Sequence, residues 1–281
     1  MAAGGLLAMR RMWTSVWLAA AVCGCGGQYV LTAPDQVAPA GGEASVVARL
    51  TRNEISRLDV PVAEAPLEFC GPWSADARAA FTDSDGFASV TMRAPQRPGR
   101  YEVCIRHKDA WGDQCQGTAR LFAWDADRPA VAVAVGALPS PGGPNAAAAV
   151  RALARIAEDA NILYLTREGV ADHEALRARM NDAGYPDGPV LPWVKRRWRM
   201  TREGRWSWLR LAFDARMVGP LEPLRKAFPN LATGICAAPA AAKAFDAAGL
   251  AVVCLADDED LPEDARRTSW AELPRTGLPT P

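Results

Sequence analysis

The stretch VAVAVGALPS, residues 131–140, decides the fold class of the second half of the chain. Its first five residues form a continuous apolar run of strand length, which is typical of a strand buried on both faces, and Gly136 then interrupts the run. The stretch holds no carboxylate, imidazole or thiol that could carry catalysis or bind a metal ion. Taken alone it is a core strand, and its wider meaning depends on the segments that follow.

Those segments alternate between helix-like and strand-like patterns. Apolar strand-length runs occur at 161–166, 233–236 and 250–255, and helical patterns occur at 145–159, 172–183, 221–228 and 237–248. Strands that are apolar on both faces and alternate with helices predict a parallel sheet covered on both sides. In such sheets the functional crevice lies at the carboxyl ends of the strands.

The first half of the chain follows a different pattern. Apolar and polar residues alternate with a period of two at 44–50, 88–93 and 101–106, between turn-rich segments, which predicts an antiparallel β-sandwich. The segments 82–92 and 98–103 resemble bacterial immunoglobulin-like modules. The expected fold is therefore a two-domain α+β chain, with an immunoglobulin-like sandwich followed by a Rossmann-like α/β domain.

The N-terminal residues resemble an export signal. Arg10 and Arg11 precede an uncharged run at 12–22, which is too short to span a bilayer as a stable helix. The run ends in Val22-Cys-Gly-Cys25, which resembles a bacterial lipoprotein processing site. We expect lipidation at Cys25, with Cys23 or an ordinary cleaved signal as alternatives.

The expected organisation is a lipoprotein signal peptide (1–24), the sandwich (25–125), the α/β domain (126–260) and a Pro-rich C-terminal tail (261–281). The chain carries 32 Lys and Arg against 32 Asp and Glu. Such a neutral balance does not favour a nucleic-acid partner. The expected location is the bacterial cell envelope, with the membrane as partner through the N-terminal anchor, on the periplasmic or outer-membrane side.

Three motifs of the α/β half occur in a distinctive order: VAVGAL (133–138), LYLT (163–166) and GICAAPAA (234–241). In this order and spacing they resemble the haloacid dehalogenase-like (HAD) phosphatase superfamily, in particular its lipin-like, phosphatidate-phosphatase-like branch. The resemblance implies a HAD-type domain over about residues 130–256. VAVGAL then corresponds to the family's D-x-D-G-T-L nucleophile motif, LYLT to its second motif and GICAAPAA to its metal-binding motif.

The resemblance puts apolar side chains where the family carries its chemistry. Gly136 and Thr166 are retained, and Arg216 stands near the position of the family's Lys. The replaced positions are Val133 at the nucleophile, Val135 at the general acid/base, Ala137 at the motif's Thr, and Ala237 and Ala241 at the metal-binding carboxylates.

Phosphoryl transfer by the family mechanism needs a carboxylate nucleophile, a second carboxylate and a magnesium ion held by oxygen ligands. The resemblance therefore implies a pseudophosphatase with no catalytic residue, no metal and no other cofactor, which acts by binding or scaffolding. The alternative is an active phosphatase-like hydrolase that uses a non-standard site.

Residues 193–210 combine basic and Trp side chains, and Arg202-Glu-Gly-Arg205 predicts a hairpin turn among them. Basic residues beside Trp suit an anionic phospholipid or a phosphate-bearing ligand. Two alternatives stay open: the Trp side chains pack over a sheet edge, or the segment binds an envelope protein. The candidate ligand-binding residues are Lys195, Arg196, Arg197, Trp198, Arg199, Arg205, Trp206 and Trp208.

Cys104 and Cys115 flank a turn-rich stretch between two strand-like runs, and we expect a disulfide between them. The pairing of Cys70, Cys236 and Cys254 stays open, although Cys236 reads as a buried thiol rather than a nucleophile. The two histidines, His107 and His173, are expected on the surface.

Overall fold

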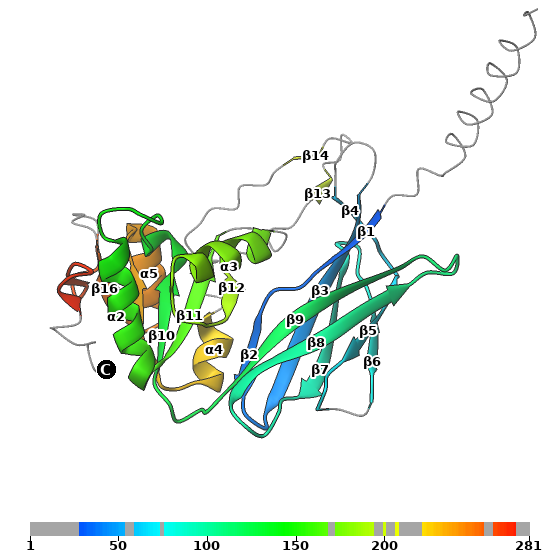
Figure 1. The fold of residues 1–281 in the computed structure, drawn as a ribbon, viewed down its shortest axis with the longest axis horizontal. Coiled ribbons are helices and arrows are strands. Elements are labelled where there is room, and N and C mark those ends of the chain that lie inside the picture. Colours follow the sequence, from blue (N-terminus) through cyan, green and yellow to red (C-terminus); the bar gives the residue numbers. More distant parts are fainter. Residues whose placement is uncertain are drawn as a thin grey trace, which may run out of the picture.

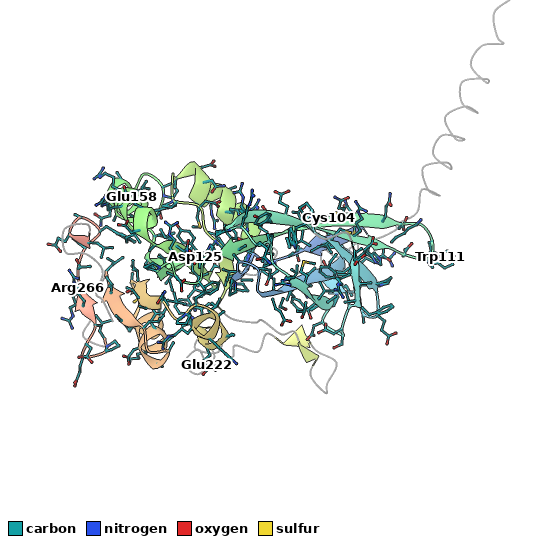
Figure 2. The ribbon with its side chains drawn as sticks, turned by 90° about the horizontal axis from the view of Figure 1, so that it is seen from below. Cys104, Trp111, Asp125, Glu158, Glu222 and Arg266 are labelled. Carbon is teal, nitrogen blue, oxygen red and sulfur yellow. The ribbon has the colours of Figure 1, made fainter. Side chains whose placement is uncertain are left out.

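The computed structural model describes residues 28–53, 59–73, 76–167, 172–193, 199–200, 206–207, 221–255 and 261–273. Within them a β-rich unit precedes a unit of alternating strands and helices (Figure 1). Figure 2 places Asp125, in the turn that joins the two units, between them.

The N-terminal unit is a sandwich of two sheets. One sheet holds β1 (Gln28–Thr32), β3 (Glu43–Asn53), β4 (Asp59–Pro61) and β7 (Phe87–Arg93). The other has the order β2-β9-β8-β5-β6, formed by β2 (Gln36–Pro39), β9 (Gln114–Trp124), β8 (Gly99–Lys108), β5 (Pro66–Cys70) and β6 (Arg78–Phe81).

The strand pairs of the sandwich are antiparallel, apart from β2, which runs parallel to β9. Alternate residues face the core, as Val103 and Ile105 of β8 show with 0% exposure. The division puts β3 and β7 in one sheet and β5, β8 and β9 in the other, which is the partition of an immunoglobulin sandwich. The predicted sandwich is confirmed.

The C-terminal unit is built on one parallel sheet with the order β12-β11-β10-β15-β16-β17. Each neighbouring pair in it is parallel, as the sequence predicts. The strands are β10 (Ala130–Ala134), β11 (Asn161–Thr166), β12 (Val190–Pro192), β15 (Leu231–Cys236), β16 (Ala251–Cys254) and β17 (Arg266–Arg267).

Helices cover both faces of this sheet. Residues of α2 (Ala146–Asp159) and α3 (His173–Asp182) share one core cluster with Val131 and Val133 of β10. Residues of α4 (Leu221–Ala227) and α5 (Pro239–Ala247) share the other with Ala132 and Ala134. All of β10 is therefore buried, which explains its uninterrupted apolar sequence.

The α/β domain extends beyond residue 260, so the predicted boundary of a separate tail is wrong. β17 adds a strand beside β16, and Trp270 and Leu273 are 5% and 2% exposed within the core cluster of the α2 face. The indole Nε1 of Trp270 donates a hydrogen bond of 3.2 Å to the carbonyl of Ala137. Residues up to at least Leu273 thus belong to the folded domain.

The predicted disulfide between Cys104 and Cys115 is also wrong. In the β8–β9 register Cys104 stands opposite Thr118, and Cys115 stands opposite His107. Cys104 lies between two inward-facing residues and so points away from the sandwich core, whereas Cys115 packs against that core. The two side chains lie on opposite faces of the sheet, and no disulfide joins them.

Both histidines are buried, contrary to expectation. His107 is 3% exposed inside β8, and its Nδ1 lies 2.9 Å from the carbonyl oxygen of Pro66. His173 begins α3 and is 1% exposed. It stands close to Asp35, a buried carboxylate that joins the two domains.

Asp35 precedes β2 in the sandwich and reaches into the α/β domain. Its carboxylate accepts a hydrogen bond of 2.5 Å from Arg177 of α3 and one of 2.8 Å from the amide of Val190. An aromatic contact adds to this interface, because the rings of Trp124 and Phe228 lie 5.4 Å apart at 64°. The domains therefore meet through charged and apolar contacts together.

Candidate functional site: a crevice at the strand ends

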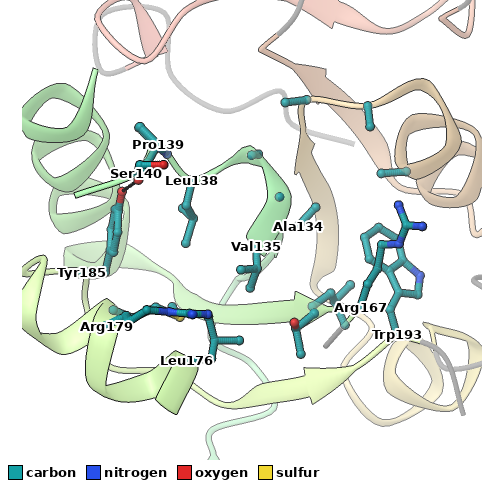
Figure 3. Close-up of a pocket in the computed structure, with 18 of the residues that line it drawn as sticks. Ala134, Val135, Leu138, Pro139, Ser140, Arg167, Leu176, Arg179, Tyr185 and Trp193 are labelled. Carbon is teal, nitrogen blue, oxygen red and sulfur yellow. Dashed lines mark hydrogen bonds between the residues drawn. The ribbon is translucent and has the colours of Figure 1, made fainter. Parts of the chain in front are cut away.

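A cavity of about 520 Å³ opens at the carboxyl ends of β10, β11 and β15 (Figure 3). The chain leaves β10 towards α2 on one face of the sheet and leaves β15 towards α5 on the other. Neighbouring strands whose connections diverge in this way leave a gap at their carboxyl ends, which is where ligands bind in open α/β sheets. The walls come from η1 (Val135–Ala137) and its following loop, the end of β11, α3 and the start of α5.

The lining is largely apolar but carries two guanidinium groups. Arg167 follows β11 directly and lies beside Trp193, while Arg179 extends from α3 beside Leu176 (Figure 3). Hydroxyl groups come from Ser140, Thr166 and Tyr185. Among the described lining residues there is no Asp, Glu, His or Cys.

Tyr185 fixes one wall of the crevice. Its hydroxyl donates a hydrogen bond of 3.1 Å to the carbonyl of Pro139, in the loop that follows η1. Burial raises the pKa of the Tyr185 hydroxyl, so it stays a neutral donor at physiological pH. The phenol oxygen still offers lone pairs, but it carries no charge.

The structure brings most of the motif positions together. Val135, Gly136 and Ala137 line the crevice, as do Thr166, Ala237 and Ala241. Val133 does not: it is 0% exposed and packs in the core cluster shared with α2 and α3. Because successive residues of a strand point to opposite faces, Ala134 points away from the side that Val133 occupies. Ala134, the last residue of β10, and Val135, which follows it, line the crevice.

Part of the predicted ligand-binding segment lies outside the described residues. The backbones of β13 (Arg199–Met200) and β14 (Trp206–Ser207) pair antiparallel, with Met200 opposite Trp206, as the arms of the predicted hairpin would. The predicted turn at 202–205 lies outside the described residues. The side chains of Arg199 and Trp206 lie outside the description, and so do, in full, Lys195, Arg196, Arg197, Trp198, Arg205, Trp208, Arg216 and the lipidation site Cys25.

The first Trp of that segment belongs to the crevice instead. Trp193 is 1% exposed, lines the cavity and packs on Phe245 of α5 with ring centroids 5.0 Å apart. Arg167, Arg179 and Tyr185 also line the crevice and were not among the site residues predicted from the sequence. A signal existed for the first two: Arg167 follows a strand end, and Arg179 stands three residues after Leu176 on one helix face.

The possible metal ligands and the Cys236 thiol also bear on the chemistry of the domain. Among the described residues no three or more His, Cys, Asp or Glu side chains gather where they could hold a metal ion. Cys236 is 0% exposed at the end of β15, and burial raises its pKa to about 12, with the neighbouring Cys254 adding to the rise. A thiol in that state is a poor nucleophile, which agrees with the buried thiol predicted from the sequence.

No protein family and no curated protein sequence matches this chain. Solved structures show partial likeness. The D00-D0 domain of intimin is 23% identical over 36% of this chain and 48% of its own length, with a TM-score of 0.27. A bacterial immunoglobulin-like domain from the ice-binding adhesin of M. primoryensis is 14% identical over 36% of this chain and 97% of its own, with a TM-score of 0.24.

A third likeness extends over more of the chain. A carbohydrate acetylesterase from Xanthomonas citri is 13% identical over 73% of this chain and 50% of its own, with a TM-score of 0.31. This chain thus spans about half the length of the intimin fragment and of the esterase. At these TM-scores the likenesses assign neither a family nor a function. No helix in the described part of the chain is long and apolar enough to cross a membrane.

Proposed function

We propose that the α/β domain is a degenerate HAD-like domain that binds, without turning over, a ligand with an apolar body and an anionic group. The observation that carries the proposal is the composition of the crevice. Val135, Ala237 and Ala241 line the crevice at positions where the resemblance places carboxylates. Two arginines, Arg167 and Arg179, line the same crevice.

The dimensions of the crevice suit such a ligand. A volume of about 520 Å³ is within the range of about 300–1,000 Å³ that small-molecule sites occupy. Apolar walls favour an acyl or similar hydrocarbon segment, since burying each methylene group contributes roughly 0.8 kcal/mol. A guanidinium group matches phosphate or carboxylate oxygens with two parallel donors. The ligand chemistry that fits is an acidic lipid, of which phosphatidic acid is the simplest phosphate-bearing form.

The setting that we propose is the bacterial cell envelope, with the chain anchored by lipid at Cys25. The export signal and the lipoprotein-like processing site support it. The basic, Trp-rich segment that follows Trp193, up to residue 210, is then a second element that contacts anionic lipid or an envelope protein. No nucleic acid, metal or cofactor enters the proposal.

Titration with a soluble short-chain phosphatidic acid, followed by calorimetry, tests the crevice directly. We expect binding by the unaltered protein and a loss of at least about tenfold when Arg167→Gln and Arg179→Gln are combined, because each removes a charge-assisted contact. The matched control is Arg151→Gln, an exposed residue of α2 that does not line the cavity. The phosphatidylcholine of equal chain length should bind more weakly. Equal binding by the double variant and the control would contradict the crevice as the site.

The enzyme alternative needs its own measurement. The protein is incubated with phosphatidic acid or a generic aryl phosphate and magnesium, and released phosphate is followed with and without a chelator. We expect no release above buffer, because the described lining holds no carboxylate to attack phosphorus. Turnover that disappears on chelation would overturn the pseudophosphatase proposal in favour of an active hydrolase.

A further inference from the structure

Two cysteines of the sandwich stand directly opposite each other on neighbouring strands. Cys70 ends β5, and its partner in the antiparallel β5–β8 register is Cys104. Directly opposed residues of antiparallel strands have Cα atoms about 4.5–5.5 Å apart, and disulfides form at Cα separations of about 4.4–6.8 Å. The backbone therefore holds these two residues at disulfide distance without rearrangement.

Both side chains point to the outer face of the sheet. Their neighbours Phe69, Val103 and Ile105 are 0% exposed and face the core, so residues 70 and 104 face the other way. Both cysteines are partly exposed, and Figure 2 shows Cys104 on the outside of the sandwich. A small thiol or disulfide in solution can therefore reach the pair.

The other described cysteines do not compete for either partner. Cys115 packs against the core on the inner face of the same sheet. Cys236 and Cys254 lie in the α/β domain, both 0% exposed and opposite each other on β15 and β16. Burial and the charge of Glu68 raise the pKa of Cys70, which favours a structural role over that of a reactive thiol.

We propose that Cys70 and Cys104 form a structural disulfide that links β5 to β8, independently of the crevice and its ligand. The oxidant is a disulfide, either a small molecule or a thiol–disulfide oxidoreductase. The thiolate of one cysteine attacks it, forming a mixed disulfide and releasing one thiol. The second cysteine then attacks the mixed disulfide and releases the other thiol. The protein gives up two electrons and two protons, and the oxidant leaves as two thiols.

The link has a structural consequence. It closes a loop that contains β6 and β7, and such a closure restricts the unfolded chain more than the folded one. For a loop of this length we expect the midpoint of thermal unfolding of the sandwich to rise on the order of 10 °C on oxidation.

The test compares the purified protein equilibrated in reduced and in oxidised glutathione. Free thiols are blocked by alkylation, and the protein is digested without reductant and mapped by mass spectrometry. We expect a peptide pair joined through Cys70 and Cys104 and a higher midpoint in the oxidised sample. Cys70→Ser and Cys104→Ser should each abolish both, whereas Cys115→Ser should retain both.

Two outcomes would overturn the proposal. One is a linkage of Cys104 to Cys115. The other is full alkylation of Cys70 and Cys104 after treatment with oxidised glutathione. Because the mapping is read in the unaltered protein, it does not depend on whether either Ser variant folds.

Discussion

Asp35 is a buried carboxylate of the sandwich that hydrogen-bonds to two residues of the α/β domain. Its carboxylate is 1% exposed and is held by Arg177 and by the amide of Val190. Burial raises its pKa to about 6, against the opposing effects of the Val190 hydrogen bond and the charges of Arg120 and His173. A buried ion pair of this kind contributes little net stability, because desolvation offsets the attraction.

The raised pKa predicts a pH trend at this residue. The folded state binds the Asp35 proton more tightly than the unfolded state, whose pKa stays near 3.8. The contribution of this group to stability is therefore fully present below about pH 4 and is lost as the pH rises to about 6. Relative to Asp35→Asn, the unaltered protein should lose up to about 3 kcal/mol over that window.

Urea unfolding of both proteins at several pH values between 4 and 7 measures this difference. Using the difference removes the effect of the other carboxylates, which both proteins share. A gap that moves in favour of the unaltered protein as the pH rises would show that attraction to Arg177 outweighs burial.

At the scale of elements, the packing of α5 on β15 depends on a glycine. A Cβ added at Gly234 would lie 2.4 Å from Cγ of Phe245, whose ring is fully buried between the helix and the sheet. The buried ring of Phe245 cannot rotate away from this contact as the end of a flexible side chain could. The glycine of the GICAAPAA motif is therefore explained by helix packing.

Gly234→Ala should lower the free energy of unfolding by roughly 1–3 kcal/mol, because the ring and helix must shift to admit the methyl group. Gly136→Ala is the matched control: nothing lies within 4 Å of its added Cβ, and its φ is outside the left-handed region. Thermal unfolding followed by circular dichroism compares the two. We expect no loss for Gly136→Ala, because an alanine restricts the unfolded chain more than a glycine does. Equal losses in the two variants would show that the effect does not come from the contact with Phe245.

The elements that were predictable from sequence are those whose pattern of apolar residues follows their burial. β10 is apolar throughout and β11 is buried over most of its length, because both faces of the sheet are covered. The strands of the sandwich alternate, because one face of each sheet is exposed to solvent. β17 was not predictable, since Arg266 and Arg267 form a two-residue edge strand with no apolar pattern. The burial of Trp270 depends on that strand and was missed with it.

The candidate site was predictable in place but not in detail. The crevice lies at the strand ends where the α/β pattern puts it, and six motif positions line it. Val133 does not line the crevice, because its side chain points into the core cluster shared with α2 and α3. Its direction depends on where β10 ends, which the apolar sequence does not show. The partners of Asp35 are more than 140 residues away along the chain, and only the docking of the domains brings them together.

At the scale of the whole molecule, the C-terminal segment closes the α/β domain. Trp270 fills the core cluster of the α2 face, and its hydrogen bond to Ala137 ties this segment to the wall of the crevice. The segment around Trp270 thus supports the wall of the crevice at Ala137.

Trp270→Ala should cost about 3–5 kcal/mol, as expected for the loss of a buried aromatic side chain. Trp111→Ala is the matched control, because Trp111 is 90% exposed in the β8–β9 turn and its loss should cost less than about 0.5 kcal/mol. Guanidinium unfolding monitored by far-UV circular dichroism gives both values. A loss of less than 1 kcal/mol for Trp270→Ala would mean that the segment after residue 260 packs only loosely.

The parallel pairing of β2 with β9 determines how the molecule would respond to tension. β9 leads directly into β10, so the α/β domain pulls β9 towards its carboxyl end. A pull on the chain before Gln28 acts first on β1, which pairs with β3, and draws β2 in the opposite direction once β1 has separated. Two parallel neighbours drawn apart along their axes are loaded in shear, and the bonds of the ladder must fail together instead of opening one at a time. A tether at the N-terminus would therefore load the sandwich in its mechanically resistant direction.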